Sequence, residues 1–222
     1  MELRDRYIEV AHAVSGRESI DLQCGACPDQ HVGSIDDFVD GSADDFPLRN
    51  PVTRLDNSPC VVLVMESPHK DEFIGEWGPA KGKTGVQIRR HIASVVRGLG
   101  GQLSALILVN AIQHQCSLGL ATHHYRDMVF RSLWANGGAA DFERRLTIVY
   151  RTGDMLLNCC TRSDPRNGLR QLVTAAIRNS LGEVPLHSGP HPYSWVSEPN
   201  RRAIRIVPAQ QTAVADTASR RG

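Results

Sequence analysis

The stretch CVVLVM, from Cys60 to Met65, is the part of this sequence that decides the fold. It is six apolar residues long, and three of them are valine. A short apolar run rich in β-branched residues is typical of a strand buried on both faces of a parallel sheet. Ligand sites in such sheets lie at the carboxyl ends of the strands, and Glu66 follows this strand directly.

Segments with strand and helix patterns alternate after this first strand. Further strands are predicted at 103–110, 146–150 and 183–188, and helices at 87–99, 125–134 and 169–181. Two of these helices are followed by a glycine that would end them, Gly100 and Gly182. The alternation predicts an α/β protein, a three-layer α/β/α sandwich with a mostly parallel, four-stranded central sheet.

The 222 residues suit one domain, which we expect over 1–207. Residues 1–50 are predicted to form a helix and an irregular lead-in, and residues 51–207 the α/β core. The apolar face of the N-terminal helix would consist of Leu3, Tyr7, Val10 and Val14. From Pro208 onward no apolar period is present, so 208–222 is predicted to be a disordered tail.

The composition is that of an ordinary soluble globular protein. It is 41% hydrophobic and 22% charged, with a net charge of +1 and a mean hydropathy of −0.27. The longest apolar run is too short to cross a bilayer, and no signal peptide is evident, so we expect a cytoplasmic protein without membrane contact. Basic residues cluster in two stretches, which are either solvated surface or nucleic-acid contacts: Lys81, Lys83, Arg89 and Arg90, and Arg201, Arg202 and Arg205.

Three motifs whose side chains could take part in binding or catalysis follow predicted strands. They are Glu66-Ser67-Pro68-His69, Asn110-Ala111-Ile112 and the segment from Ser188 to Trp195. The amide of Asn110 can donate and accept hydrogen bonds at once, which suits recognition of a base edge. His191 lies between two prolines, which hold it rigidly. Each motif alone is also compatible with a simple turn.

The glycine-rich segment GPAKGKTG, from Gly78 to Gly85, raises the alternative of a nucleotide-binding P-loop. That loop requires a glycine where Trp77 stands, and it follows a strand immediately, which this segment does not. A nucleotide hydrolase is therefore disfavoured. The segment can still offer backbone N–H groups to a DNA phosphate at the start of a helix.

Taken in order, these motifs resemble those of the uracil-DNA glycosylase superfamily over roughly residues 60–195. Glu66-Ser67-Pro68-His69 and the Gly78–Gly85 segment are similar to the G-E-A-P-G and G-P-F-V-G-R-A-G motifs of its iron–sulfur branch, with Met65 and His69 replacing the two glycines of the first. Asn110-Ala111-Ile112 resembles its N-A-V motif, and His191-Pro192 its H-P dipeptide.

The resemblance implies a DNA glycosylase that flips a base out of DNA and hydrolyses its N-glycosidic bond, without a metal. Glu66 would stabilise the cationic sugar and orient water, and His191 would donate to the departing base. The remaining roles are also implied: base contacts from Asn110, Ser67, His69 and Ala80, and DNA contacts from Lys83, Thr84, Gly85, Ser188, Tyr193 and Trp195. Tyr193 or Trp195 would be the side chain that fills the gap left by the flipped base.

Three positions depart from the family pattern around the base. Ala80 replaces a stacking Phe, Ser67 stands where well-known members have a catalytic Asp, and His69 stands where they have a Tyr. The smaller residue at position 80 predicts a base larger than uracil, such as a modified cytosine of phage DNA, and hence a role in antiviral defence. Uracil removal in DNA repair is the alternative, and Ser67 leaves open an inactive nucleic-acid-binding module.

The cysteines suggest a further feature of the resembled branch, a 4Fe–4S cluster. Cys24 and Cys27 form a C-x-x-C pair, and Cys116 lies close to the place of the family's third ligand. The fourth ligand would be Cys159 or Cys160, which lies much further along the chain than the family pattern requires. Free thiols are the alternative. We expect DNA as the partner and a monomeric protein.

Overall fold

The computed structural model describes residues 2–16, 22–38, 46, 54, 58–101, 105–120, 122–162 and 168–208. The helices are α1 (Leu3–Ser15), α2 (Lys83–Gly98), α3 (Thr122–Leu133), α4 (Ala139–Val149), α5 (Leu169–Leu181) and α6 (Glu198–Arg202). The strands are β1 (Gln30–Ser34), β2 (Cys60–Met65), β3 (Ala105–Asn110), β4 (Met155–Asn158), β5 (Leu186–Ser188) and β6 (Arg205–Ile206). The predicted tail, apart from Pro208, lies outside the described residues.

The sheet is mixed and has six strands in the order β1-β3-β2-β4-β5-β6. The four inner strands are parallel, whereas β1 pairs antiparallel with β3 and β6 antiparallel with β5. The α/β class is therefore confirmed, but the prediction of four strands is wrong. Both edge strands, QHVGS and RI, lack the apolar pattern of β2 and β3, so their composition does not predict a strand.

The predicted strand at 146–150 is also wrong, because these residues end helix α4. The helix buries Phe142, Arg145, Leu146 and Val149, which recur at the three- and four-residue spacing of one helical face. Ile148, in contrast, is exposed. The third parallel strand is instead β4, which begins directly after the turn at Gly153 and Asp154.

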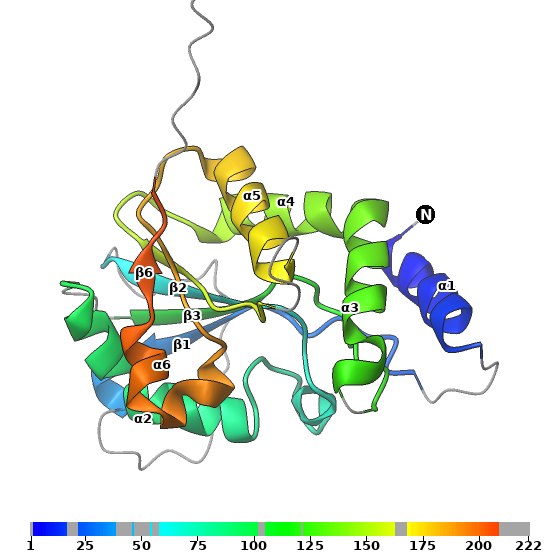
Figure 1. Cartoon of the computed structure of the whole chain (residues 1–222), viewed down its shortest axis with the longest axis horizontal. Coiled ribbons are helices and arrows are strands. Elements are labelled where there is room, and N and C mark those ends of the chain that lie inside the picture. The colour runs from blue at the N-terminus through cyan, green and yellow to red at the C-terminus, as the bar shows by residue number, and fades with distance from the viewer. Residues whose placement is uncertain are drawn as a thin grey trace, which may run out of the picture.

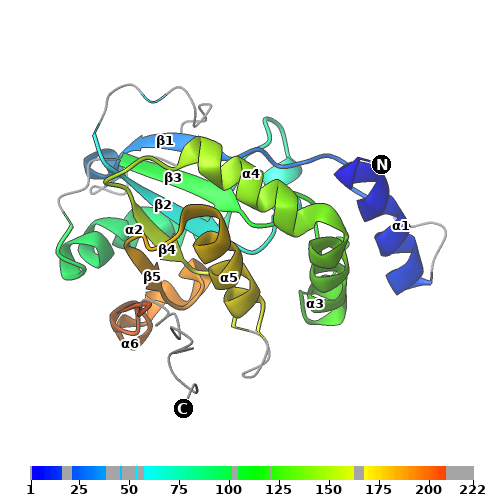
Figure 2. The same cartoon turned by 90° about the horizontal axis from the view of Figure 1, so that it is seen from above.

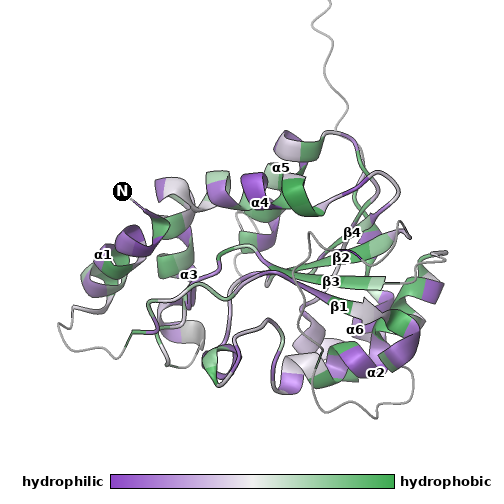
Figure 3. Cartoon of the chain, turned by 180° about the vertical axis from the view of Figure 1, so that it is seen from behind, coloured by the Kyte–Doolittle hydropathy of each residue, from purple (hydrophilic) through white to green (hydrophobic). Residues whose placement is uncertain are grey.

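Helices cover both faces of the sheet, as Figures 1 and 2 show for α4 and α5 on one side and α2 and α6 on the other. Val62, Val64, Ile107 and Val109 pack in the first core, whose other members come largely from α1, α3, α4 and α5. The alternate residues of the strands pack in a second core with α2 and Trp195. In Figure 3 the inner strands are accordingly hydrophobic, while α2 shows one apolar and one polar face.

Helix α1 packs against α3, as the apolar face predicted for it requires. Tyr7 is fully buried, stacks on His114 and donates its hydroxyl to the Gln115 carbonyl oxygen at 2.9 Å. Through these contacts α1 supports the loop that follows β3. None of the helices in the described part of the chain is long and apolar enough to cross a membrane.

Candidate functional site

A cavity of about 540 Å³ opens at the carboxyl ends of the parallel strands, where ligand sites of α/β sheets lie. Its walls come from the ends of β2 and β4, the start of α2, helix α3 and the loop after β5. The lining residues that carry polar side chains are Glu66, Ser67, His69, Asp71, Glu72, Lys81, Lys83, Thr84, Ser117, Arg126, Thr161, His191, Tyr193 and Ser194.

Glu66 is a buried carboxylate on the wall of this cavity. One of its oxygens, Oε2, accepts the Thr161 N–H at 2.9 Å, and the other, Oε1, lies 3.2 Å from Nε of Arg126. Its backbone carbonyl accepts the Ile112 N–H, which joins the turns after β2 and β3. Groups from two other elements thus face the buried carboxylate and compensate for its removal from water.

His191 lies across the sheet from Glu66, after β5, and also lines the cavity. Its Nδ1 accepts the Tyr193 N–H at 3.3 Å. Burial lowers the pKa of His191, which favours the neutral ring. A neutral ring whose Nδ1 accepts carries its proton on Nε2, so the side chain offers one N–H donor.

Glu72 is a second buried carboxyl group on the cavity wall, and it belongs to none of the motifs recognised in the sequence. Its Oε2 accepts Nδ2 of Asn110 at 3.2 Å and faces the Cys27 thiol at 3.8 Å. Burial raises the pKa of Glu72 to about 8. Asn110, expected to contact the base, is not in the cavity lining, and its Oδ1 has no hydrogen-bond partner among the residues that the structure describes.

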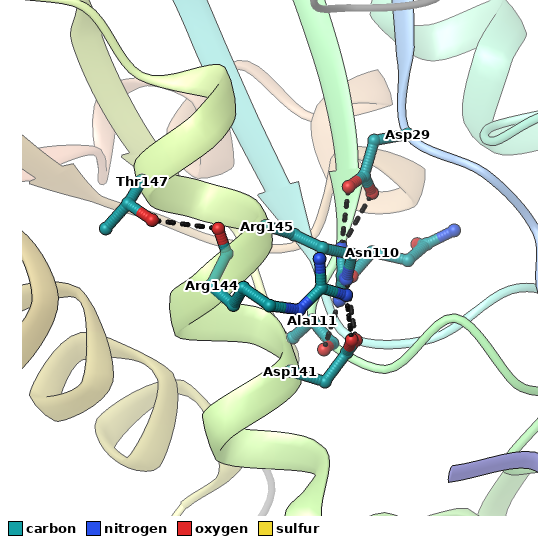
Figure 4. Close-up of polar contacts among 7 residues, drawn as sticks. All are labelled: Asp29, Asn110, Ala111, Asp141, Arg144, Arg145 and Thr147. Atoms are coloured by element: carbon teal, nitrogen blue, oxygen red, sulfur yellow. Dashed lines mark hydrogen bonds and ion pairs between the residues drawn. The ribbon is translucent and has the colours of Figure 1, made fainter. Parts of the chain in front are cut away.

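The carboxyl end of β3 is held by Arg145 of helix α4 (Figure 4). Its guanidinium donates to the carbonyl oxygens of Asn110 and Ala111 at 3.1 and 3.0 Å. It also forms ion pairs with Asp29 and Asp141, each at 2.7 Å. One buried cation thus ties the segment before β1, the turn after β3 and helix α4 together beside the site.

The expected DNA-contacting residues of the Gly78–Gly85 segment lie at the start of α2. Lys83 and Thr84 line the cavity, together with Lys81. Gly85 does not, and its backbone is packed against the preceding loop: a Cβ there would lie 1.9 Å from the Ala80 carbonyl oxygen. The glycine is therefore required by a close approach of two backbones.

Of four other predicted site residues, one is exposed at the cavity and three lie outside its lining. Tyr193 is 57% exposed at the cavity, whereas Trp195 is fully buried in the second core and donates Nε1 to the Pro190 carbonyl oxygen at 3.1 Å. Ala80 is likewise fully buried in that core, with a φ of +59°, and does not line the cavity. Ser188 ends β5 outside the lining. Tyr193 is thus the aromatic side chain available to a ligand.

Ser67 and His69 both line the cavity, on the turn after β2. His69 is exposed, and its Nδ1 lies 3.2 Å from Asp71 Oδ2 and 3.4 Å from the Asp71 backbone nitrogen. Ser67 is partly buried beside the thiol of Cys116.

The predicted cluster ligands are free thiols in different surroundings. Cys24 is partly exposed and faces the Leu22 carbonyl oxygen, Cys27 faces Glu72, and Cys116 faces the His114 carbonyl oxygen. Cys159 and Cys160 are buried after β4. No three His, Cys, Asp or Glu side chains among the described residues form a group that could hold a metal ion. The iron–sulfur cluster implied by the resemblance stays a prediction.

Arg126 and Thr161 are the partners of Glu66 that sequence reasoning missed. Arg126 lies on a predicted helix without a motif, and Thr161 contributes only its backbone, so neither carried a recognisable signal.

No family model matches the sequence, and no curated protein matches it significantly.

Proposed function

We propose that the protein is a DNA glycosylase, which hydrolyses the bond between a base and its deoxyribose and leaves an abasic site. The observation that carries the proposal is that Glu66 and His191, which are 125 residues apart in sequence, line one cavity. A carboxylate and a neutral imidazole donor are the two groups that this reaction needs, because positive charge develops on the sugar and negative charge on the base.

In the proposed reaction the target nucleotide leaves the base stack and its base enters the cavity. The C1′–N bond breaks, and the base departs with the electron pair while Nε2–H of His191 donates to it. Glu66 stabilises the cationic sugar and orients a water molecule, which adds to C1′. The proton that this water molecule loses is finally transferred to the departed base, which leaves as a neutral molecule. Lys81, Lys83 and Thr84 provide donors for the DNA phosphates at the cavity.

We further propose a pyrimidine larger than uracil as the base, such as a modified cytosine of phage DNA. The support is the volume of the cavity, about 540 Å³, which lies in the range of pockets for drug-sized ligands, roughly 300–1,000 Å³. Ala80 no longer supports this idea, because its side chain faces the core. An Ala80→Phe change would overpack that core and would not block the base.

The test is an assay of abasic sites in matched DNA samples: unmodified, uracil-containing, and phage DNA with enlarged cytosines. Abasic sites in the phage DNA alone are the expected result. Release of uracil without action on the modified DNA would assign the protein to repair of deaminated cytosine. DNA binding without abasic sites in any sample would contradict the proposal and favour a binding module.

A further inference from the structure

Arg126 is a cation of the cavity lining that contacts Glu66 and belongs to none of the motifs. It lies on α3, its side chain is 16% exposed, and it lines the cavity beside Glu66. Its Nε lies 3.2 Å from Oε1 of Glu66, while Thr161 N–H bonds the other carboxylate oxygen. The two contacts come from separate elements, so together they fix both the position and the rotation of the carboxylate.

Asp127 contacts the same Nε edge of the guanidinium that faces Glu66 and accepts a hydrogen bond there. Its Oδ1 lies 2.9 Å from both Nε and Nη2 of Arg126. The three side chains carry one positive and two negative charges, a net charge of −1 with Asp127 and Glu66 ionised. A guanidinium whose charge is already offset by two neighbouring carboxylates attracts a phosphate weakly, whereas the remaining negative charge favours a cationic sugar.

We propose that Arg126, oriented by Asp127, is a positioning residue that holds the Glu66 carboxylate for attack on the sugar. This inference rests on the proposed glycosylase function. The other groups near Glu66 do not replace it: Arg170 is directed to the Cys160 carbonyl oxygen at 2.7 Å, and His191 is held by Tyr193 N–H. Without Arg126 the carboxylate keeps one bond, to Thr161, and can rotate about it.

The experiment compares Arg126→Gln, Arg126→Lys and Asp127→Asn with the wild type, on uracil-containing and phage-modified DNA. For Arg126→Gln we expect kcat to fall about 10- to 100-fold, as for other small misplacements of catalytic groups, with KM nearly unchanged. Lysine should restore part of the rate, and Asp127→Asn should lower kcat by less than Arg126→Gln does. Arg131→Gln, on the same helix and outside the cavity lining, is the matched control.

A second readout does not depend on turnover. The slope of log Kd against log salt concentration for DNA should be the same in Arg126→Gln and in the wild type. A slope smaller by about one, or a higher KM at unchanged kcat, would mean that Arg126 binds a phosphate and would overturn the inference. A crystal structure of Arg126→Gln should show the Glu66 carboxylate rotated, and an unmoved carboxylate would also overturn it. Failure of the glycosylase proposal is recognised separately, by wild-type protein that releases no base.

Discussion

At the scale of single residues, Glu66 is the group whose charge the proposed chemistry uses most directly. Glu66→Gln keeps the shape of the side chain and an oxygen for Thr161 N–H, but it removes the negative charge. We expect base release to fall about 10²-fold or more, with DNA affinity retained. Single-turnover base release and DNA titration measure the two effects. The exposed Glu76→Gln change in the loop after β2 is the control, and wild-type turnover in Glu66→Gln would exclude the assigned role.

His191 supplies the proposed donor to the departing base. His191→Ala removes Nε2–H and leaves the Tyr193 N–H without its acceptor. The rate of base release should again fall about 10²-fold, while DNA binding should change little. His12→Ala, on the exposed side of α1, is the comparison. If His191→Ala leaves the rate of base release unchanged, the donor must be another residue of the cavity lining.

Most of the candidate site residues that could be predicted lie in motifs after a strand, and Lys83 and Thr84 come from the glycine-rich segment before α2. Glu66 could be selected because it directly follows an apolar run, and His191 because it lies between two prolines after a predicted strand. Glu72, Arg126 and Thr161 could not, because two of them lie in helical segments with ordinary surface composition and the third acts through its backbone. Their roles depend on which elements meet, and one sequence does not contain that information directly.

At the scale of elements, the ion pairs of Arg145 join three segments that are distant in sequence. Arg145→Met leaves Asp29 as a buried carboxylate without its cation, so we expect a loss of about 3–5 kcal/mol in the free energy of unfolding. Chemical denaturation measures it. The neighbouring Arg144, with a side chain that is 63% exposed, makes a comparable ion pair with Asp141 at the surface.

Arg144→Met is therefore the matched control, and it should cost less than about 1 kcal/mol. Adding Asp29→Asn to Arg145→Met should recover part of the lost stability, because it removes the unpaired charge. If both arginine changes lower the free energy of unfolding equally, the buried ion pairs of Arg145 stabilise the protein no more than the exposed one of Arg144.

The helix α4 also explains the largest error of the sequence-based fold. Leu146 to Tyr150 has the apolar, β-branched composition of a strand, but its burial follows the helical spacing that begins at Phe142. A window of five residues cannot distinguish the two periods. The true strand β4 is only four residues long, and its Asn158 has no strand preference. It forms because β2 and β5 flank it.

At the scale of the whole molecule, the central β-α alternation was predictable because β2 and β3 are apolar runs followed or separated by helical patterns. The edges were not, because β1 and β6 are set by pairing with a neighbouring strand and not by their own composition. The layers on both faces of the sheet followed from the alternation of elements. The fold class is therefore a property of the sequence pattern, and the strand number is a property of the assembled structure.

The buried carboxyl of Glu72 predicts a pH dependence of overall stability. Its pKa is about 8 in the folded state, against an ordinary value of 4.5, so the folded protein retains a proton that the unfolded chain loses between these pH values. The contribution of Glu72 to the free energy of unfolding therefore falls as pH rises from about 4.5 to 8. Glu72→Gln should gain stability relative to the wild type over this range and level off above it.

Urea denaturation of both proteins across this pH range measures the difference, with Glu76→Gln as the control. If the difference in free energy of unfolding between Glu72→Gln and the wild type stays constant with pH, the folded protein does not hold Glu72 in its protonated form. Because Glu72 holds Asn110, the same variant should be checked for base release at each pH.

The Glu66 carboxylate is held by groups from positions 126 and 161, and its partner across the cavity stands at position 191. A chain still being synthesised on the ribosome therefore carries Glu66 long before it carries the groups that orient it. Until translation has passed β5, the nascent polypeptide has no assembled site. The proposed base removal therefore requires that the chain has been synthesised and folded at least as far as His191.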